Sequence, residues 1–219
     1  MRKYDYALFD FDGTLFDTFL GIARSYSNAL KLCYGREFPD LSEFRKCVGP
    51  PLVSSFVDFY GVPPAEVDHV IEVFRARYNT LGVLECEPYP GVREMLRDLR
   101  AAGVRVGIAS SKPEEMIHKI LGNNGLLGAF DCIAGLKGEH DRDSTKTDAI
   151  LEAMRCLGAA DKSRVAMVGD RYYDAEGAEN AGVDFVAALY GFAKDGEFAP
   201  YPSVFHAKTA ADVAAFLLG

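Results

Sequence analysis

Two aspartates stand two residues apart at the end of a short apolar run near the start of the sequence. Residues 6–9 predict a buried strand, and Asp10 and Asp12 follow it, with Gly13 next. Because a glycine bends the chain just beyond them, both carboxylates can face the carboxyl-terminal edge of a sheet, where open parallel sheets bind ligands. Taken alone, the pattern also fits a strand followed by an Asp-Gly turn.

A second pair of aspartates follows another apolar run. Residues 165–168 predict a buried strand that delivers Asp170 to the same edge, and Asp174 comes one helical turn later. Carboxylate oxygens are hard ligands that suit Mg²⁺, which takes one or two carboxylates and keeps several waters. The alternative for these acids is helix capping.

Hydroxyl and ammonium groups stand at two further positions. Ser110, Ser111 and Lys112 follow the predicted strand 104–109 and precede a helix, where free N–H groups bind anions. Lys146 precedes another helix, although the helix dipole disfavours a cation there, so a bound anion would explain it. Plain capping by serine and a solvated lysine are the alternatives when each signal is taken alone. Together, the four positions present two pairs of carboxylates, a hydroxyl group and an ammonium group, which are the groups that phosphoryl transfer needs.

The elements that must position these groups alternate between short apolar runs and helical patterns. Further strands are predicted at 132–134, 185–188 and 204–205. Helices follow Gly91, with Val92, Leu96 and Leu99 on one face, and span residues 147–157. Strands alternating with helices predict an α/β fold, a Rossmann-like parallel sheet with helices on both faces.

One long stretch breaks the alternation. Residues 16–87 contain helical patterns, at 18–34, 51–60 and 65–81, and no convincing strand. A helical block inserted after the first strand predicts a separate cap. We therefore predict an α/β core domain from residues 1–15 and 88–219, and an α-helical cap domain from residues 16–87.

The composition of the chain limits the classes of molecule that it could bind. The formal net charge is -8 and the pI is about 5.1, which argues against nucleic acid or an anionic membrane as a partner. No apolar run reaches the roughly 20 residues of a membrane span, and no signal peptide is visible, so we expect a cytoplasmic protein.

Five scattered cysteines predict buried thiols in a reducing compartment. They are Cys33, Cys47, Cys86, Cys132 and Cys156.

The order and spacing of these elements resemble the haloacid dehalogenase superfamily, in its phosphoglycolate-phosphatase-like branch with an α-helical cap. The resemblance covers essentially the whole chain. It is carried by the Asp-x-Asp-Gly-Thr motif at residues 10–14 and the Gly-Asp-x-x-x-Asp motif at residues 169–174.

The resemblance implies a role for each motif residue. Asp10 is the expected nucleophile and Asp12 the general acid/base. The carboxylates of Asp10 and Asp170, with the backbone carbonyl of Asp12, would hold Mg²⁺, and Asp174 would orient that site. Lys146 would bind phosphate oxygens as a catalytic residue.

Further positions are expected to bind substrate. Ser110 would bind phosphate oxygens, and Thr14, Ser111 and Lys112 lie in the same motifs, although Ser111 stands where many relatives have asparagine. In the predicted cap, the turn that begins at Gly49, with Lys46 nearby, is expected to face the core site; a plain helix connector is the alternative. These substrate-binding candidates are Thr14, Lys46, Gly49, Ser110, Ser111 and Lys112.

The sequence therefore predicts a Mg²⁺-dependent phosphatase that acts on a small phosphorylated metabolite through an aspartyl-phosphate intermediate. Phosphoglycolate, sugar phosphates and nucleoside monophosphates all remain open as substrates, and the protein is expected to be a monomer or homodimer. A phosphosugar mutase and a phosphonate-cleaving enzyme are alternatives with related chemistry. A protein phosphorylated on aspartate by a partner, or an inactive binding protein, is the non-enzymatic alternative.

Overall fold

The computed structural model describes residues 3–138 and 144–219, and the chain divides into two compact units. One unit is formed by Met1–Asp17 with Pro88–Gly219, and the other by Thr18–Glu87. The first passage between the units thus falls after residue 17, two residues beyond the predicted boundary. The connecting segments β2 (Phe16–Asp17) and β3 (Glu87–Pro88) pair as a two-stranded sheet.

The first unit is built on a six-stranded sheet in the order β5-β4-β1-β6-β7-β8, and every neighbouring pair is parallel. In register, Phe9 lies beside Ile108 on one side and Val168 on the other. The residues that follow these three positions therefore emerge at one edge of the sheet. The strands are β1 (Tyr6–Phe9), β4 (Arg105–Pro113), β5 (Cys132–Leu136), β6 (Val165–Gly169), β7 (Asp184–Ala188) and β8 (Phe205–Ala207).

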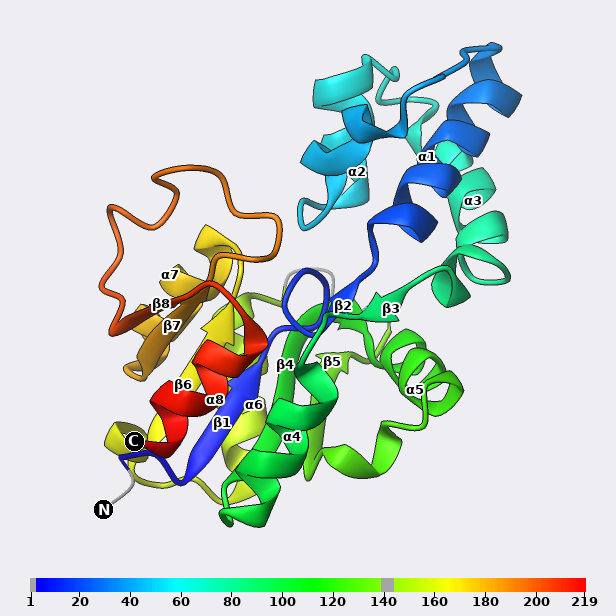
Figure 1. The fold of residues 1–219 in the computed structure, drawn as a ribbon. Coiled ribbons are helices and arrows are strands. Elements are labelled where there is room, and N and C mark those ends of the chain that lie inside the picture. The colour runs from blue at the N-terminus through cyan, green and yellow to red at the C-terminus, as the bar shows by residue number, and fades with distance from the viewer. Residues whose placement is uncertain (1–2, 139–143) are drawn as a thin grey trace. The chain divides into compact units, whose positions relative to one another are not determined.

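Helices cover both faces of this sheet (Figure 1). Helices α4 (Val92–Ala101) and α8 (Ala210–Leu218) pack together on one face, and α6 (Lys146–Leu157) and α7 (Tyr172–Ala181) pack together on the other. Helix α5 (Glu114–Asn123) contacts β4 and β5. The predicted Rossmann-like fold is confirmed. Because both sheet faces are covered, β6 is buried along its whole length and β1 at every residue after Tyr6.

The second unit is helical, and the rings of three phenylalanines and Tyr60 surround Tyr26 at its centre. The ring centroids of Phe56, Phe74 and Phe44 lie 4.6, 4.9 and 5.8 Å from that of Tyr26, distances typical of aromatic packing. Helix α1 (Phe19–Tyr34) packs on α3 (Val67–Tyr78). The shorter elements are η1 (Leu41–Cys47), α2 (Leu52–Ser54), η2 (Ser55–Phe59) and η3 (Gly82–Leu84).

One helix prediction in this unit needs correction, and one short helix was not predicted. The predicted helix 51–60 is a short α2 that continues as a π-helix over Ser55–Phe59. A 3-10 helix, Leu41–Cys47, was missed because seven residues are too few to show a 3.6-residue period. Asp40 begins it by accepting a hydrogen bond from the N–H of Ser42 at 2.8 Å.

The prediction for the cysteines is wrong for one pair. The structure joins Cys132 of β5 to Cys156 of α6 as a disulfide, with their Cα atoms 6.2 Å apart. Sequence spacing gave no sign of the pair because the packing of α6 on β5 brings together residues 24 positions apart. Cys47 and Cys86 are buried thiols, as predicted, and Cys33 is a half-buried thiol. Among the described residues, no helix combines the length and apolarity needed to cross a bilayer.

Candidate active site

Three buried carboxylates meet at the carboxyl-terminal edge of the sheet. Asp10 follows β1, Asp170 follows β6, and Asp174 lies in the first turn of α7. Each offers an oxygen atom, and these oxygens lie within 4.8 Å of one another. The N–H of Asp10 donates to the carbonyl of Val168 at 2.9 Å, which continues the strand pairing and fixes the backbone between the acids. The structure thus brings together three of the four aspartates that the sequence singled out for metal binding.

Lys146 reaches into this group from the start of α6. Its Nζ lies 2.8 Å from Oδ1 of Asp10 and 2.8 Å from Oδ1 of Asp174, and its side chain is 8% exposed. Thr145 sets the start of the helix through a capping box with Asp148. Gly177 of α7 leaves room for the lysine stem, since a Cβ there would lie 2.7 Å from Cγ of Lys146.

Burial and mutual repulsion dominate the electrostatics of the group. Burial raises the pKa of Asp170 well above its usual range, and the charges of Asp174 and Asp10 raise it further. Burial also raises the pKa of Asp174, to about 6, although Lys146 opposes the rise. For Lys146, burial lowers the pKa, but the charges of Asp10 and Asp174 more than offset it and raise the pKa above its ordinary value. A further cation near these carboxylates would be stabilised.

Asp170 is held by two neutral donors. Thr14 donates its hydroxyl to Oδ1 at 3.1 Å, and the backbone N–H of Phe192 donates to Oδ2 at 2.7 Å. The turn after β1 must be glycine: Gly13 has φ +83°, and a Cβ on it would lie 2.2 Å from Oδ2 of Asp170. The Asp-x-Asp-Gly-Thr motif therefore supplies a donor and a close approach to Asp170 as well as two acids.

Asp12 has different surroundings from the three clustered acids. Its carboxylate pairs with Lys112, whose Nζ lies 2.9 Å from Oδ1 and 3.2 Å from Oδ2. Its side chain is 20% exposed, and it is not among the three clustered carboxylates. A metal role for Asp12 through its backbone carbonyl therefore stays a prediction. Lys112, predicted to bind substrate, contacts the predicted acid/base in this structure.

The other predicted residues fall into two sets. Ser110 is buried within β4, which continues past the predicted end at residue 109, and it accepts a hydrogen bond from the N–H of Lys112 at 3.3 Å, whereas Ser111 is exposed. Lys46 and Gly49 belong to the second unit: Nζ of Lys46 lies 4.8 Å from the ring centroid of Tyr60, and Gly49 has φ +103°. Their role toward a substrate stays a prediction.

Sequence reasoning missed the segment that follows β7. Besides the N–H of Phe192, it contributes Tyr190, whose hydroxyl donates to the carbonyl of Thr14 at 3.0 Å. It also contributes Gly191, where a Cβ would lie 2.2 Å from the carbonyl oxygen of Gly13. The only available signal was a glycine just after a predicted strand, and this pattern is too common to stand out.

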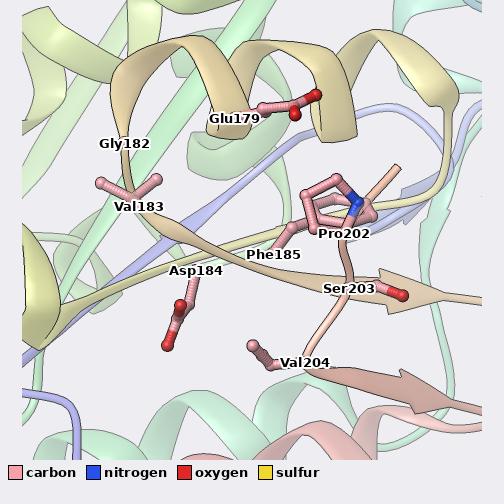
Figure 2. A pocket seen from close by; sticks show the side chains of 8 residues that line it. All are labelled: Glu179, Gly182, Val183, Asp184, Phe185, Pro202, Ser203 and Val204. Atoms are coloured by element: carbon pink, nitrogen blue, oxygen red, sulfur yellow. The ribbon is translucent and has the colours of Figure 1, made fainter. Parts of the chain in front are cut away.

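A hollow of about 360 Å³ lies elsewhere on the same unit (Figure 2). It contains none of the predicted site residues, and its Asp184 forms an ion pair with Lys3 at 2.8 Å. We assign it no function. Its lining residues are Glu179, Gly182, Val183, Asp184, Phe185, Pro202, Ser203 and Val204.

Comparison with known proteins identifies the family. The model of the haloacid dehalogenase-like hydrolases matches residues 7–188. The chain belongs to this family. A haloacid dehalogenase-like family hydrolase from Streptococcus pneumoniae has the same architecture, with a TM-score of 0.88, 25% identity and 98% of each chain covered.

Curated relatives carry several names. Tyrosine-protein kinase PtkA of Mycobacterium tuberculosis is 34% identical over 85% of this chain, and the match spans 62% of the kinase. A 5'-nucleotidase of Pseudomonas aeruginosa is 31% identical, with 89% of this chain and 87% of the relative covered. A phosphoglycolate phosphatase of Aquifex aeolicus is 30% identical, with 85% of each covered. The predicted family is confirmed, and the relatives' names span more than one activity.

The residues at the edge of the sheet fit the Mg²⁺ ion that haloacid dehalogenase-like phosphatases typically use. The cluster offers hard oxygen donors from Asp10, Asp170 and Asp174. Oδ1 of Asp10 and Oδ1 of Asp174 are buried and accept no hydrogen bond of good geometry among the described residues, although Nζ of Lys146 is near both. Buried oxygens of this kind, in a group with excess negative charge, are suited to a divalent cation.

Proposed function

We propose that this protein is a Mg²⁺-dependent phosphatase of small phosphate monoesters that works through an aspartyl-phosphate on Asp10. One observation carries the proposal: two aspartates two residues apart lie in different surroundings. Asp10 is buried beside Lys146 and two acids, whereas Asp12 is outside that cluster and pairs with Lys112. Two carboxyl groups that serve as nucleophile and as acid/base need different surroundings, because one must attack as a carboxylate and the other must give and take a proton.

In the proposed first step, a carboxylate oxygen of Asp10 attacks the phosphorus atom and the ester P–O bond breaks. Asp12 gives a proton to the leaving oxygen, which departs as an alcohol. In the second step, Asp12 takes a proton from the attacking water. The bond from Asp10 to phosphorus then breaks, which releases inorganic phosphate and restores the Asp10 carboxylate.

The chain's cations and donors would serve these steps. Lys146, 2.8 Å from Asp10, would bind phosphate oxygens and offset their repulsion of the nucleophile, and Ser110 would donate a hydrogen bond to the phosphate. Asp10, Asp170 and Asp174 would hold Mg²⁺. When bound, the ion supplies charge stabilisation for the transferring phosphoryl group. Lys46 and Gly49 are the proposed substrate contacts of the helical unit.

The proposed partner is a small phosphorylated metabolite, and the proposed location is the cytoplasm. The test is release of inorganic phosphate from a panel of phosphoglycolate, sugar phosphates and nucleoside monophosphates, with Mg²⁺ or with chelator. Wild type should release phosphate only with the metal, and Asp10→Asn should release none. Asp161→Asn is the matched control, because Asp161 is an exposed acid that caps the short helix η6 (Lys162–Arg164). Metal-independent release, or release by Asp10→Asn, would refute the mechanism.

The likeness to PtkA favours a second candidate, phosphoryl transfer from a nucleoside triphosphate to a protein tyrosine. There a tyrosine hydroxyl, rather than water, would accept the phosphoryl group. Incubation with γ-labelled ATP and tyrosine-containing peptides separates the two functions. Label on tyrosine without phosphate release from the panel would establish the kinase, and free labelled phosphate would favour the phosphatase.

A further inference from the structure

The segment after β7 returns to the candidate metal ligand Asp170 and packs closely against it. The N–H of Phe192 donates to Oδ2 of Asp170 at 2.7 Å, a shorter hydrogen bond than the one from the Thr14 hydroxyl to Oδ1 at 3.1 Å. A Cβ on Gly191 would lie 2.5 Å from the same oxygen. This loop backbone therefore orients Asp170 together with the Thr14 hydroxyl.

Glu197 closes the same loop. Its side chain is 8% exposed and accepts from the N–H of Lys194 at 2.8 Å, within the loop. It also accepts from Nε of Arg171 at 2.8 Å and from the N–H of Tyr172 at 2.9 Å. One half-buried carboxylate thus joins the loop that holds Asp170 to the two residues that follow Asp170.

The hydrogen bond from the N–H of Tyr172 to Glu197 also provides an acceptor for a backbone donor at the start of α7. Helix starts leave N–H groups without partners within the helix, and an acceptor normally comes from the residue just before the helix. That residue is Arg171, whose guanidinium carries no acceptor. Glu197, 25 residues along the chain, supplies the acceptor instead, and its negative charge is favourable at a helix N-terminus.

The same helix start carries Asp174. Its Oδ2 accepts from the N–H of Arg171 at 3.0 Å, so the backbone that Glu197 binds also orients a second clustered acid. Burial raises the pKa of Glu197, but the N–H of Lys194, the Arg171 guanidinium and the N–H of Tyr172 together bring it below its ordinary value. Glu197 is therefore a stable anion where it makes these contacts.

We propose that Glu197 is a positioning residue for the metal site, acting through Phe192 on Asp170 and through Arg171 on Asp174. The proposal rests on the proposed function, because it takes the clustered acids to be the Mg²⁺ site. Without its carboxylate, the loop and the helix start lose the contacts that Glu197 makes to both, and the two acids are held less firmly in the orientation that a metal requires. Partners that orient metal ligands commonly contribute about 10- to 100-fold in metal affinity.

The test is direct titration of the whole chain with Mg²⁺ by calorimetry, alongside the thermal midpoint of each variant. Glu197→Gln keeps the shape but places an amide N–H₂ among N–H donors. We expect its Kd for Mg²⁺ to rise about tenfold. Glu85→Gln is the matched control, since Glu85 also accepts from arginine, at 2.9 and 3.0 Å from Arg77, but lies in the other unit. Its Kd should equal that of wild type.

The outcomes separate the two proposals. A lower midpoint with an unchanged Kd in Glu197→Gln would give Glu197 a purely structural role and overturn the inference, while the proposed function stands. Wild type that binds no Mg²⁺ would overturn both. Should Glu197→Gln fail to fold, Glu197→Asp keeps the charge and shortens the side chain by one methylene. Weakened Mg²⁺ binding there supports the inference, and wild-type binding overturns it.

Discussion

Gly177 is predicted to control activity although it carries no side chain. It lies in α7 beside the stem of Lys146, and an added Cβ would be 2.7 Å from Cγ and 3.0 Å from Cβ of that lysine. Ordinary contact begins at 3.4 Å, so the lysine must move by about 0.7 Å. The atoms that clash are next to the backbone of α6, so rotation of the flexible end of the side chain does not relieve the clash.

The displacement should reduce catalysis more than stability. Nζ of Lys146 lies 2.8 Å from both Asp10 and Asp174, and a misplacement of about 1 Å at a catalytic group costs about 100-fold. We therefore expect Gly177→Ala to lower kcat/KM by about 10- to 100-fold. Alanine gains about 0.5–1 kcal/mol as a helix former, and overpacking costs about 1–3 kcal/mol. A net loss of about 0–2.5 kcal/mol lowers Tm by at most about 10 °C for a chain of this size.

Gly122→Ala is the matched control. Gly122 lies in helix α5, and its Cβ would meet nothing within 4 Å. It should gain stability and keep the kcat/KM of wild type. The assay is phosphate release at 25 °C with Mg²⁺, with Tm measured on the same samples. A folded Gly177→Ala with wild-type kcat/KM would show that Lys146 needs no fixed position, and an equal loss in both variants would show an effect unrelated to Lys146.

Three further predictions follow from the same site. Asp12→Asn should slow hydrolysis of an alkyl phosphate far more than that of p-nitrophenyl phosphate, whose leaving group needs little protonation; equal losses in phosphate release would exclude Asp12 as the acid. Mg²⁺ should raise the Tm of wild type, chelator should reverse the rise, and Asp170→Asn should show none; a rise in that variant would place the metal elsewhere. The pKa of Glu197 is lowered from 4.5, so its stabilising contribution is present above that pH and is lost as pH falls through the folded-state pKa. The stability difference between wild type and Glu197→Gln, from urea unfolding, should therefore be full near neutrality and shrink below about pH 4.5, and a constant difference would contradict the ion-pair account.

Much of the site could be predicted because the sheet obeys a simple rule. Asp10, Ser110 and Asp170 each follow an apolar run, and parallel strands in register bring such ends to one edge. The pattern needs only local sequence and the alternation of strands and helices. It therefore identified the clustered acids without any knowledge of their distances.

What escaped prediction depends on contacts between distant parts of the chain. Glu197 caps a helix 25 residues before it, and Cys132 meets Cys156 across a strand and a helix. Neither contact leaves a periodic pattern, since each depends on how elements pack after they form. Lys112 is a different case: its position predicted an anion site, which stays a prediction, but its ion pair joins the last residues of β4 to Asp12 after β1, and no local pattern indicates that contact. Local patterns locate the strand ends but do not determine which side chains meet there.

Most of the hydrogen-bond donors around the clustered acids carry no formal charge to them, and this bears on what the site binds. Thr14 and the N–H groups of Phe192 and Arg171 orient Asp170 and Asp174 without carrying a formal charge to them. Lys146 partly offsets the negative charge, and it contacts Asp10 and Asp174. Fixed neutral donors preserve the negative potential and remove the cost of reorganising the carboxylates when a ligand arrives. A fold that needed only stability would replace buried, mutually repelling acids with apolar residues, so their retention is best explained by a bound cation.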